Sequence, residues 1–317
     1  MHSTRGVAHE AAQHLESVGI TVAKRVLAEA PPRFRYGLSV VPVEQLASSF
    51  GVAVTSSGDV VDASLAPLKE LGLDGLVRTT SEASSAETAT SWFASDYEVQ
   101  ILGQGFRSRF TLAHELAHVV LSREYGQLER SLSLNQRERV CDIAAGNILC
   151  PEEALIEHFR TRAEMTLTVS EIERLAGRMR ISISLALNRL RQLVFQNALS
   201  VANVALLVSL ARSRKRHEHL APRIASACSP SRWFVPLNTR LSTIGLGALQ
   251  DAFYKAPVYA GGRTNEVLRL WDYELGRRAD IPCDVRFKCY RWVSSRPSTD
   301  TAENRIMLAV ANCEGTP

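Results

Sequence analysis

The chain has 317 residues, of which 45% are hydrophobic and 22% are charged, and its formal net charge is +4. This composition is typical of a globular protein with a sizeable core, and it excludes a disordered or collagen-like chain. The length predicts two domains, with one or three as alternatives. The N-terminus lacks the apolar core of a signal peptide, and the longest apolar-rich run, Leu199 to Ala211, is too short to cross a bilayer. We therefore expect a soluble, cytoplasmic protein that contacts no membrane.

Positive charge is concentrated in the middle of the chain. Residues 160–232 contain thirteen Arg or Lys against four Glu and no Asp, which is roughly +9 formally. Such a segment could bind nucleic acid or an acidic protein, and a solvated surface is an equally good interpretation.

The cysteines are sparse and form no C-x-x-C pair, so neither a disulfide framework nor a cysteine zinc site is expected. They are Cys141, Cys150, Cys228, Cys283, Cys289 and Cys313.

The predicted elements of the first half mix helices with strands. Apolar spacing predicts helices over residues 9–30 and 42–50, and the alternation of apolar and polar residues predicts short strands. These strands cover residues 52–54, 75–78 and 97–102, separated by loops at 56–66 and 79–90. Two long helices follow, one from Arg109 to about Leu121 and one from about Asn135 to Leu149. Pro151 marks the end of the second helix.

A pair of short helices comes next. Ser170 and Glu173 have the spacing of a capping box, and Ser182 can cap a second helix. Two short helices with a tight link have the proportions of a helix-turn-helix unit. Beyond about Ser200 the pattern becomes irregular, and strands are clearest over residues 286–293 and 305–310.

The stretch His114-Glu115-Leu116-Ala117-His118 carries the strongest chemical signal. Residues four apart share one face of a helix, so both imidazoles can bind one metal ion, with Glu115 at the edge of that face. This is the H-E-x-x-H pattern of zinc metallopeptidases, in which the glutamate acts as the general base. The flanking residues are apolar, and buried histidines are costly unless they are paired or metal-bound. A hydrogen-bonded pair of core histidines is the alternative.

A catalytic zinc ion needs a third protein ligand. The helix predicted over residues 135–149 offers Glu138 and Asp142, again four apart, and spacing alone leaves both open. Asp142 could instead orient a histidine through its second ring nitrogen. Glu124 and Glu129 are expected to be solvated loop charges. By position alone, the candidates for stabilising the transition state are Tyr125, Arg123 and His158.

Two motifs resemble those of the ImmA/IrrE-type metallopeptidases. Arg109 to His118, R-F-T-L-A-H-E-L-A-H, closely resembles the family motif R-F-T-[LI]-A-H-E-[LI]-G-H. Residues 138–151 resemble E-x-x-A-x-x-F-A-x-x-L-L-M-P, whose leading glutamate is the third ligand, and this selects Glu138 over Asp142. The resemblance covers roughly residues 25–195. The departures Ala117, Cys141 and Ala144 remove neither a ligand nor the base, and Cys141 is expected to be a buried structural thiol.

The resemblance implies a zincin-like fold and a narrow activity. Members of the family look like intracellular regulatory endopeptidases. The expected metal of this chain is zinc, and the sequence itself does not decide between zinc and manganese. They cleave helix-turn-helix (XRE-like) repressors and so release stress or mobile-element genes. In the IrrE branch, a helix-turn-helix-like segment and a GAF-like sensor domain follow the zincin-like domain. The mixture of predicted elements favours an α+β protein, and we expect domains at residues 1–165, 166–198 and 199–317, the last of them GAF-like by analogy.

Two other hypotheses concern the rest of the chain. The first is a DNA-binding transcriptional regulator built on an inert zincin-like scaffold, in which arginines of the helix pair would contact phosphates. Ordinary surface charge is the favoured alternative for these arginines. The arginines of this first hypothesis are Arg178, Arg180, Arg189 and Arg191. The second hypothesis is that the C-terminal domain senses a ligand or a partner and gates the peptidase.

Overall fold

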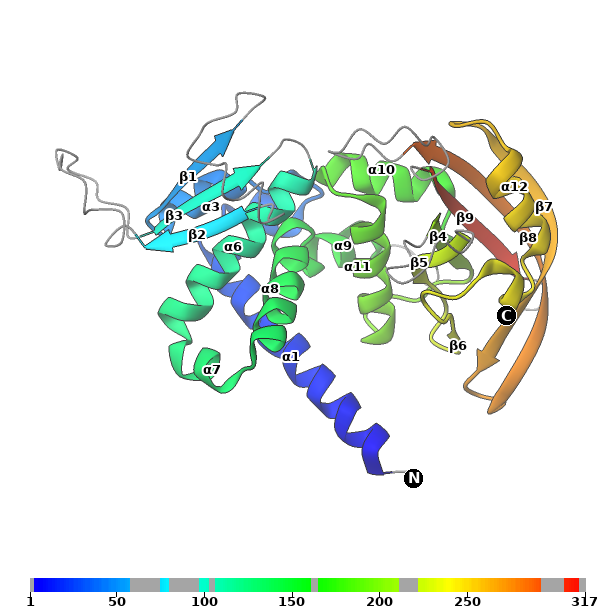
Figure 1. The fold of residues 1–317 in the computed structure, drawn as a ribbon, viewed down its shortest axis with the longest axis horizontal. Coiled ribbons are helices and arrows are strands. Elements are labelled where there is room, and N and C mark those ends of the chain that lie inside the picture. Colours follow the sequence, from blue (N-terminus) through cyan, green and yellow to red (C-terminus); the bar gives the residue numbers. More distant parts are fainter. Residues whose placement is uncertain are drawn as a thin grey trace, which may run out of the picture. The chain divides into compact units, whose positions relative to one another are not determined.

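The computed structural model of this chain describes residues 3–57, 75–79, 97–102, 106–160, 165–210, 222–291 and 305–313. These residues form an α+β protein, as the sequence predicts. The chain divides into two compact units (Figure 1), one of residues 1–157 with 178–181 and one of residues 158–177 with 182–317. No helix in the described ranges is both long enough and apolar enough to cross a membrane. The division at residues 165 and 198 remains a prediction.

The first unit combines a small sheet with several helices. Strands β1 (Val52–Ser57) and β2 (Gly75–Thr79) flank β3 (Tyr97–Leu102), with β1 parallel and β2 antiparallel to β3. Helix α6 (Phe106–Glu124) packs against β2 and β3, where Val99 and Ile101 are buried. The other helices are α1 (Ser3–Ala28), α2 (Pro32–Tyr36), α3 (Val43–Ser49), α7 (Gly126–Ser131), α8 (Leu134–Leu149) and α9 (Glu152–Phe159), the last of which runs on into the second unit.

Helices α1 and α8 approach each other closely at Gly19. A methyl group placed there would lie 2.6 Å from Cγ2 of Ile143 and 2.9 Å from the carbonyl oxygen of Val140. The backbones can be this close only because Gly19 has no side chain. Since α8 carries residues of the candidate metal centre described below, this contact helps to place them.

We expect Gly19→Ala to lower the free energy of unfolding by about 1–3 kcal/mol, because the added methyl group forces α1 and α8 apart. Chemical denaturation of the purified protein measures this. Gly177→Ala is the matched control, since a methyl group there meets no described atom within 4 Å. It should stabilise its helix by about 0.5–1 kcal/mol. Equal stability of the two variants would contradict the close-packing argument.

The predicted pair of short helices is present as α10 (Val169–Met179) and α11 (Ile183–Phe195). Ser182 caps α11 as predicted, because its hydroxyl accepts from the backbone N–H of Leu185 at 3.1 Å. The capping box of α10 was predicted two residues too late. The hydroxyl of Thr168 accepts from the N–H of Glu171, and the Glu171 carboxylate accepts from the N–H of Thr168, both at 3.1 Å. Ser170 is the second residue of the helix.

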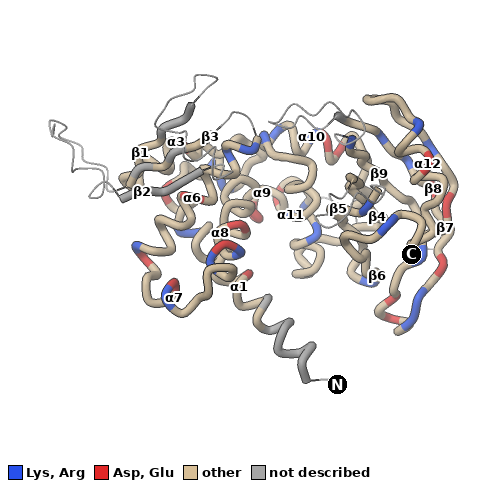
Figure 2. The backbone as a smooth tube through the Cα atoms, in the orientation of Figure 1, with Lys and Arg blue, Asp and Glu red and all other residues tan. Residues whose placement is uncertain are grey.

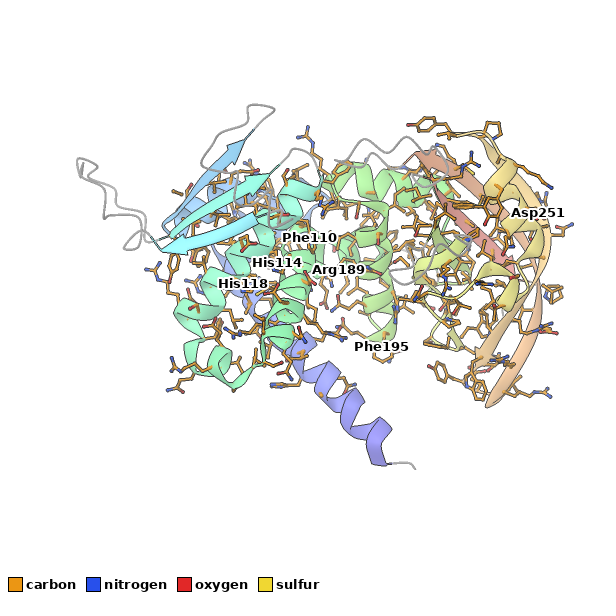
Figure 3. All side chains as sticks on the ribbon, viewed as in Figure 1. Phe110, His114, His118, Arg189, Phe195 and Asp251 are labelled. Atoms are coloured by element: carbon orange, nitrogen blue, oxygen red, sulfur yellow. The ribbon has the colours of Figure 1, made fainter. Side chains whose placement is uncertain are left out.

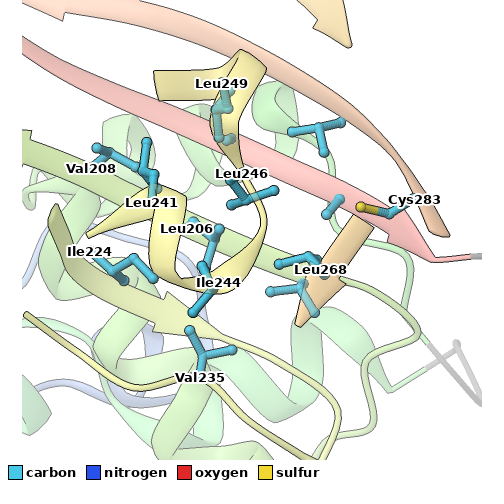
Figure 4. Packing of buried hydrophobic residues seen from close by; sticks show 14 of the residues in the cluster. Leu206, Val208, Ile224, Val235, Leu241, Ile244, Leu246, Leu249, Leu268 and Cys283 are labelled. Atoms are coloured by element: carbon cyan, nitrogen blue, oxygen red, sulfur yellow. The ribbon is translucent and has the colours of Figure 1, made fainter. Parts of the chain in front are cut away.

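The second unit is built on a six-stranded antiparallel sheet, in the order β5-β4-β9-β8-β7-β6. Its inner face packs against a 3-10 helix, η2, and against α12, through a core that includes Leu206, Leu249 and Leu268 (Figure 4). Helix α11 packs against β4 and β5, and Asn188 accepts from the Ser226 hydroxyl at 2.6 Å. The elements are β4 (Val204–Leu210), β5 (Pro222–Cys228), β6 (Trp233–Phe234), η2 (Leu241–Ile244), α12 (Gly247–Lys255), β7 (Gly261–Asp272), β8 (Arg277–Arg291) and β9 (Arg305–Cys313).

Candidate metal centre

Helix α6 presents His114 and His118 side by side (Figure 3). Leu112, Leu116 and Val120 on this helix are buried, and their burial fixes its orientation. The Nε2 atoms of the two histidines lie 3.1 Å apart, and the two rings meet edge to face. The imidazoles therefore point at the same place, as the four-residue spacing predicts.

Helix α8 brings Glu138 to the two histidines. The helix begins at a capping box, in which the Ser133 hydroxyl accepts from the N–H of Gln136 and the Gln136 side chain accepts from the N–H of Ser133. One Glu138 oxygen lies 3.3 Å from Nε2 of His114, and the other lies 3.4 Å from Nε2 of His118. In the described ranges, no other three His, Cys, Asp or Glu side chains converge in this way.

The distances between these atoms suit a tetrahedral metal ion. Metal–ligand bonds of about 2.05 Å at tetrahedral angles separate neighbouring ligand atoms by about 3.3 Å. The three contacts of 3.1, 3.3 and 3.4 Å are close to that value, and the two that involve Glu138 are made by its two different oxygens. The Glu138 side chain is 50% exposed, so the cluster is open to solvent on one side. Two imidazoles and a carboxylate with an open position are the donor set of a catalytic zinc site.

Asp142 contacts the other nitrogen of His114. Its Oδ1 atom lies 2.9 Å from Nδ1 of His114. When the ring proton sits on Nδ1 and is donated to Asp142, the lone pair of Nε2 faces the cluster. Asp142 therefore lies where the sequence analysis put it as a group that orients a histidine.

The charges of the cluster change the proton affinities of its members. Burial lowers the pKa of His114, but the hydrogen bond and charge of Asp142, with Glu115 and Glu138, outweigh it and leave the pKa raised. Burial and the charge of His114 lower the pKa of His118. Burial also raises the pKa of Glu115. The charge of His114 opposes this shift, and the charge of Glu138 reinforces it. Glu115 is therefore a stronger base than an exposed glutamate.

The alternative carboxylate ligands have other partners. Glu124 pairs with Arg25 of α1 at 2.7 Å, and Glu129 lies 3.6 Å from Arg137. Cys141 is fully buried, and burial together with the charges of Glu138 and Glu115 raises the pKa of its thiol well above the ordinary value of a cysteine. Neither the two glutamates nor this cysteine belongs to the convergent cluster.

The residues suggested for transition-state stabilisation lie at the ends of helices. Arg123 donates to the carbonyl oxygen of Phe50 at 3.2 Å, which ties the end of α6 to the turn before β1. Tyr125 lies between α6 and α7 and is half-buried, and His158 is exposed, with its ring centroid 4.6 Å from that of Phe159. Their catalytic role remains a prediction. Arg109, for which the sequence suggested no role, donates to the carbonyl oxygen of Val41 at 2.9 Å and anchors the start of α6.

The four candidate phosphate-binding arginines differ in exposure. Arg178, Arg180 and Arg191 are exposed. Arg189 (Figure 3) is only 2% exposed, and its guanidinium donates to Gln192 on the same helix. The structure thus places Arg189 away from any surface where a phosphate could bind, and this part of the prediction is corrected.

Basic side chains elsewhere are interleaved with acidic ones. On the six-stranded sheet, residues of both charges lie along β7 and β8 (Figure 2). Arg263 pairs there with Asp284, and Arg269 pairs with Asp280. The basic run at residues 212–216 lies outside the described residues. The described part of the sheet therefore offers mixed charge to a partner.

A segment of the chain is similar to a known protein family. Residues 105–191, which contain the convergent cluster, match the peptidase M78 family, described as an IrrE N-terminal-like domain. These residues resemble an IrrE N-terminal-like domain. The resemblance inferred from the two motifs is thereby confirmed for this IrrE-like segment.

The chain is similar in fold to a solved structure over most of its length. A Mycobacterium tuberculosis transcriptional regulator superposes with a TM-score of 0.51 at 12% sequence identity, over 94% of this chain and 76% of that one. At this identity the similarity is one of fold alone. The comparison with curated proteins gives no match.

Proposed function

We propose that this protein is a metal-dependent endopeptidase in which His114, His118 and Glu138 hold a zinc ion. The observation that carries this proposal is the convergence of three side chains whose ligand atoms all lie within 4.8 Å of one another, on a segment that resembles a peptidase family. The His114–Asp142 hydrogen bond adds to it, since metal-binding histidines commonly donate to a carboxylate. Manganese is the alternative metal, because imidazole and carboxylate ligands accept both ions.

The reaction relies on Glu115 for proton transfer. When bound, the metal ion supplies a Lewis acid that polarises the scissile carbonyl and makes a water molecule more acidic. A carboxylate oxygen of Glu115 takes the proton of the attacking water and delivers it to the nitrogen of the leaving amine. Burial raises the pKa of Glu115 and so increases its affinity for this proton. Asp142 keeps the His114 ring fixed during the reaction.

The substrate we propose is a helix-turn-helix (XRE-like) transcriptional repressor in the cytoplasm. The ImmA/IrrE resemblance supports this choice, because cleavage of such a repressor releases stress or mobile-element genes. The fold shared with a transcriptional regulator also fits a role in gene control. We propose further that residues 199–317 form a GAF-like sensor domain that gates the peptidase.

The test of this function uses the purified full-length protein and the helix-turn-helix repressor encoded nearest to its gene. Bound metal is measured first, and the repressor is then incubated with the metal-loaded and the chelator-treated protein. We expect one metal ion per chain and cleavage at a single site only by the loaded form. An intact repressor with the fully loaded protein would refute this substrate. If general peptide substrates also remained intact, the peptidase proposal itself would fail.

The sensor hypothesis has its own test. Phe253 is fully buried in the core of the second unit, so Phe253→Ala should loosen that core. If this part of the chain gates the peptidase, the variant changes the cleavage rate or its response to the signal while its metal content stays constant. An unchanged rate and response in a variant with a loosened core would count against gating.

A DNA-binding regulator on an inert scaffold is the second candidate function. The exposure of Arg178, Arg180 and Arg191 on the α10–α11 helix pair favours it. Binding through phosphates would weaken steeply as salt rises. Mobility-shift assays at low salt test it directly, and a protein that shifts no duplex there does not act through DNA contacts.

A further inference from the structure

Two cysteines face each other across neighbouring strands of the second unit. Strands β8 and β9 are antiparallel, and Cys283 is the register partner of Cys313. Both side chains belong to the inner-face core, where they are 5% and 9% exposed, and Figure 4 shows Cys283 at the edge of that core. Directly opposed residues of an antiparallel pair have Cα atoms about 4.5–5.5 Å apart, which is within the range that a disulfide spans.

The two thiols also interact directly. The side chains of Cys283 and Cys313 are hydrogen-bonded to each other. The Cys283 sulfur lies 3.5 Å from the carbonyl oxygen of Glu266, and the Cys313 sulfur lies 3.8 Å from that of Ala311. Because the two residues are direct register partners, their sulfur atoms require only small movements to bond.

The hydrogen bond makes the two cysteines unequal. It lowers the pKa of Cys283, against the effects of burial and of the carboxylates of Glu266 and Asp284. The same hydrogen bond and burial raise the pKa of Cys313. Cys283 is therefore the thiol that more readily becomes a thiolate, which is the form that reacts with oxidants.

We propose that Cys283 and Cys313 form a reversible disulfide when the protein meets a hydroperoxide. This modification site lies in the second unit and does not depend on the proposed peptidase activity. The disulfide would covalently join the end of β9 to β8 in the middle of the sheet.

The chemistry balances with hydrogen peroxide as the oxidant. The Cys283 thiolate attacks one peroxide oxygen, the O–O bond breaks, and the released hydroxide takes up a proton to leave as water. Cys283 is then a sulfenic acid. The Cys313 sulfur attacks the Cys283 sulfur, the S–O bond breaks, and the departing hydroxide accepts the Cys313 proton. Two thiols and one peroxide have become one disulfide and two waters.

Cys289 provides a matched control. It is also on β8, is also buried in the inner-face core, and differs from Cys283 in that its register partner is Met307. It therefore has no thiol opposite it. A treatment that merely oxidised accessible cysteines would not single out Cys283 and Cys313.

The experiment uses the full-length wild-type protein, oxidised with hydrogen peroxide in its folded state. Free thiols are alkylated, and the digest is analysed by mass spectrometry without reduction. We expect a cross-linked peptide pair containing Cys283 and Cys313, lighter by two hydrogen atoms than the sum of its parts and lost after thiol reduction. The oxidised protein should also unfold at a temperature higher by about 5 °C, because the bond restricts the unfolded chain.

Substitutions separate the pair from other cysteines. Cys283→Ser and Cys313→Ser should each abolish the cross-link, and Cys289→Ser should keep it. Since buried substitutions can impair folding, the peptide map of the wild type decides the question by itself. Recovery of both Cys283 and Cys313 in alkylated form after oxidation would overturn the proposal, and so would a cross-link to any other cysteine.

Discussion

Glu115→Gln should abolish peptide cleavage while leaving the bound metal in place. Glutamine has nearly the same shape as glutamate, but its amide cannot accept and return the proton of the attacking water. Loss of a positioned general base typically lowers the rate by about 10²- to 10⁴-fold. His114, His118 and Glu138 are unchanged in this variant, so the metal content should equal that of the wild type. Steady-state cleavage and metal analysis on one preparation measure both quantities.

The matched control for this variant is Glu124→Gln. Glu124 lies on the same helix, but it pairs with Arg25 at 2.7 Å and takes no part in the convergent cluster. Its loss removes an ion pair at the protein surface, worth at most about 1 kcal/mol. Cleavage should therefore proceed at the wild-type rate. If Glu115→Gln cleaved as fast as this control, Glu115 would not be the base.

The elements around the centre follow from local sequence patterns. Apolar residues at helical spacing define α6 and α8, and the structure extends the predicted ranges by only a few residues, to Phe106–Glu124 and Leu134–Leu149. The two histidines share a face because four residues are close to one helical turn. This inference needs no knowledge of the tertiary structure.

The choice between Glu138 and Asp142 could not be made from spacing. Both lie on one face of α8, one turn apart, and either could reach α6 depending on how the two helices are offset. That offset depends on packing between distant segments, including the contact of α1 with α8 at Gly19. The structure puts Glu138 beside both Nε2 atoms and Asp142 beside Nδ1 of His114. The family motif selected Glu138 because the position of its leading glutamate already reflects how the two helices pack in the family.

Two local errors have similar causes. Thr168 with Glu171 and Ser170 with Glu173 both fit the capping-box pattern. The structure uses the first pair, and Glu173 instead pairs at 2.6 Å with Lys288, a residue remote in sequence. Arg189 was grouped with exposed arginines because of its charge. It lies, however, at positions three and four from the buried Ala186 and Leu193, on the apolar stripe of α11. That periodicity could have revealed its burial.

Removal of the third ligand should have the largest effect on metal binding. In Glu138→Ala, the only carboxylate facing both histidine Nε2 atoms is lost among the described residues, and two imidazoles remain. We expect metal affinity to fall by more than about 100-fold, beyond the 10- to 100-fold that loss of a supporting group costs. Competition with a chelator measures the affinity, and cleavage should disappear in parallel.

Asp142→Asn distinguishes a ligand from a group that orients one. Its amide oxygen can still accept the hydrogen bond from Nδ1 of His114 but carries no charge, so we expect metal affinity to fall only about 10- to 100-fold. Saturating metal should then restore cleavage in Asp142→Asn more fully than in Glu138→Ala. The reverse order, with Asp142→Asn losing the metal and Glu138→Ala keeping it, would exchange the two roles. Because the two carboxylates sit one turn apart on α8, this comparison tests the offset of α6 and α8 as well as the chemistry of the site.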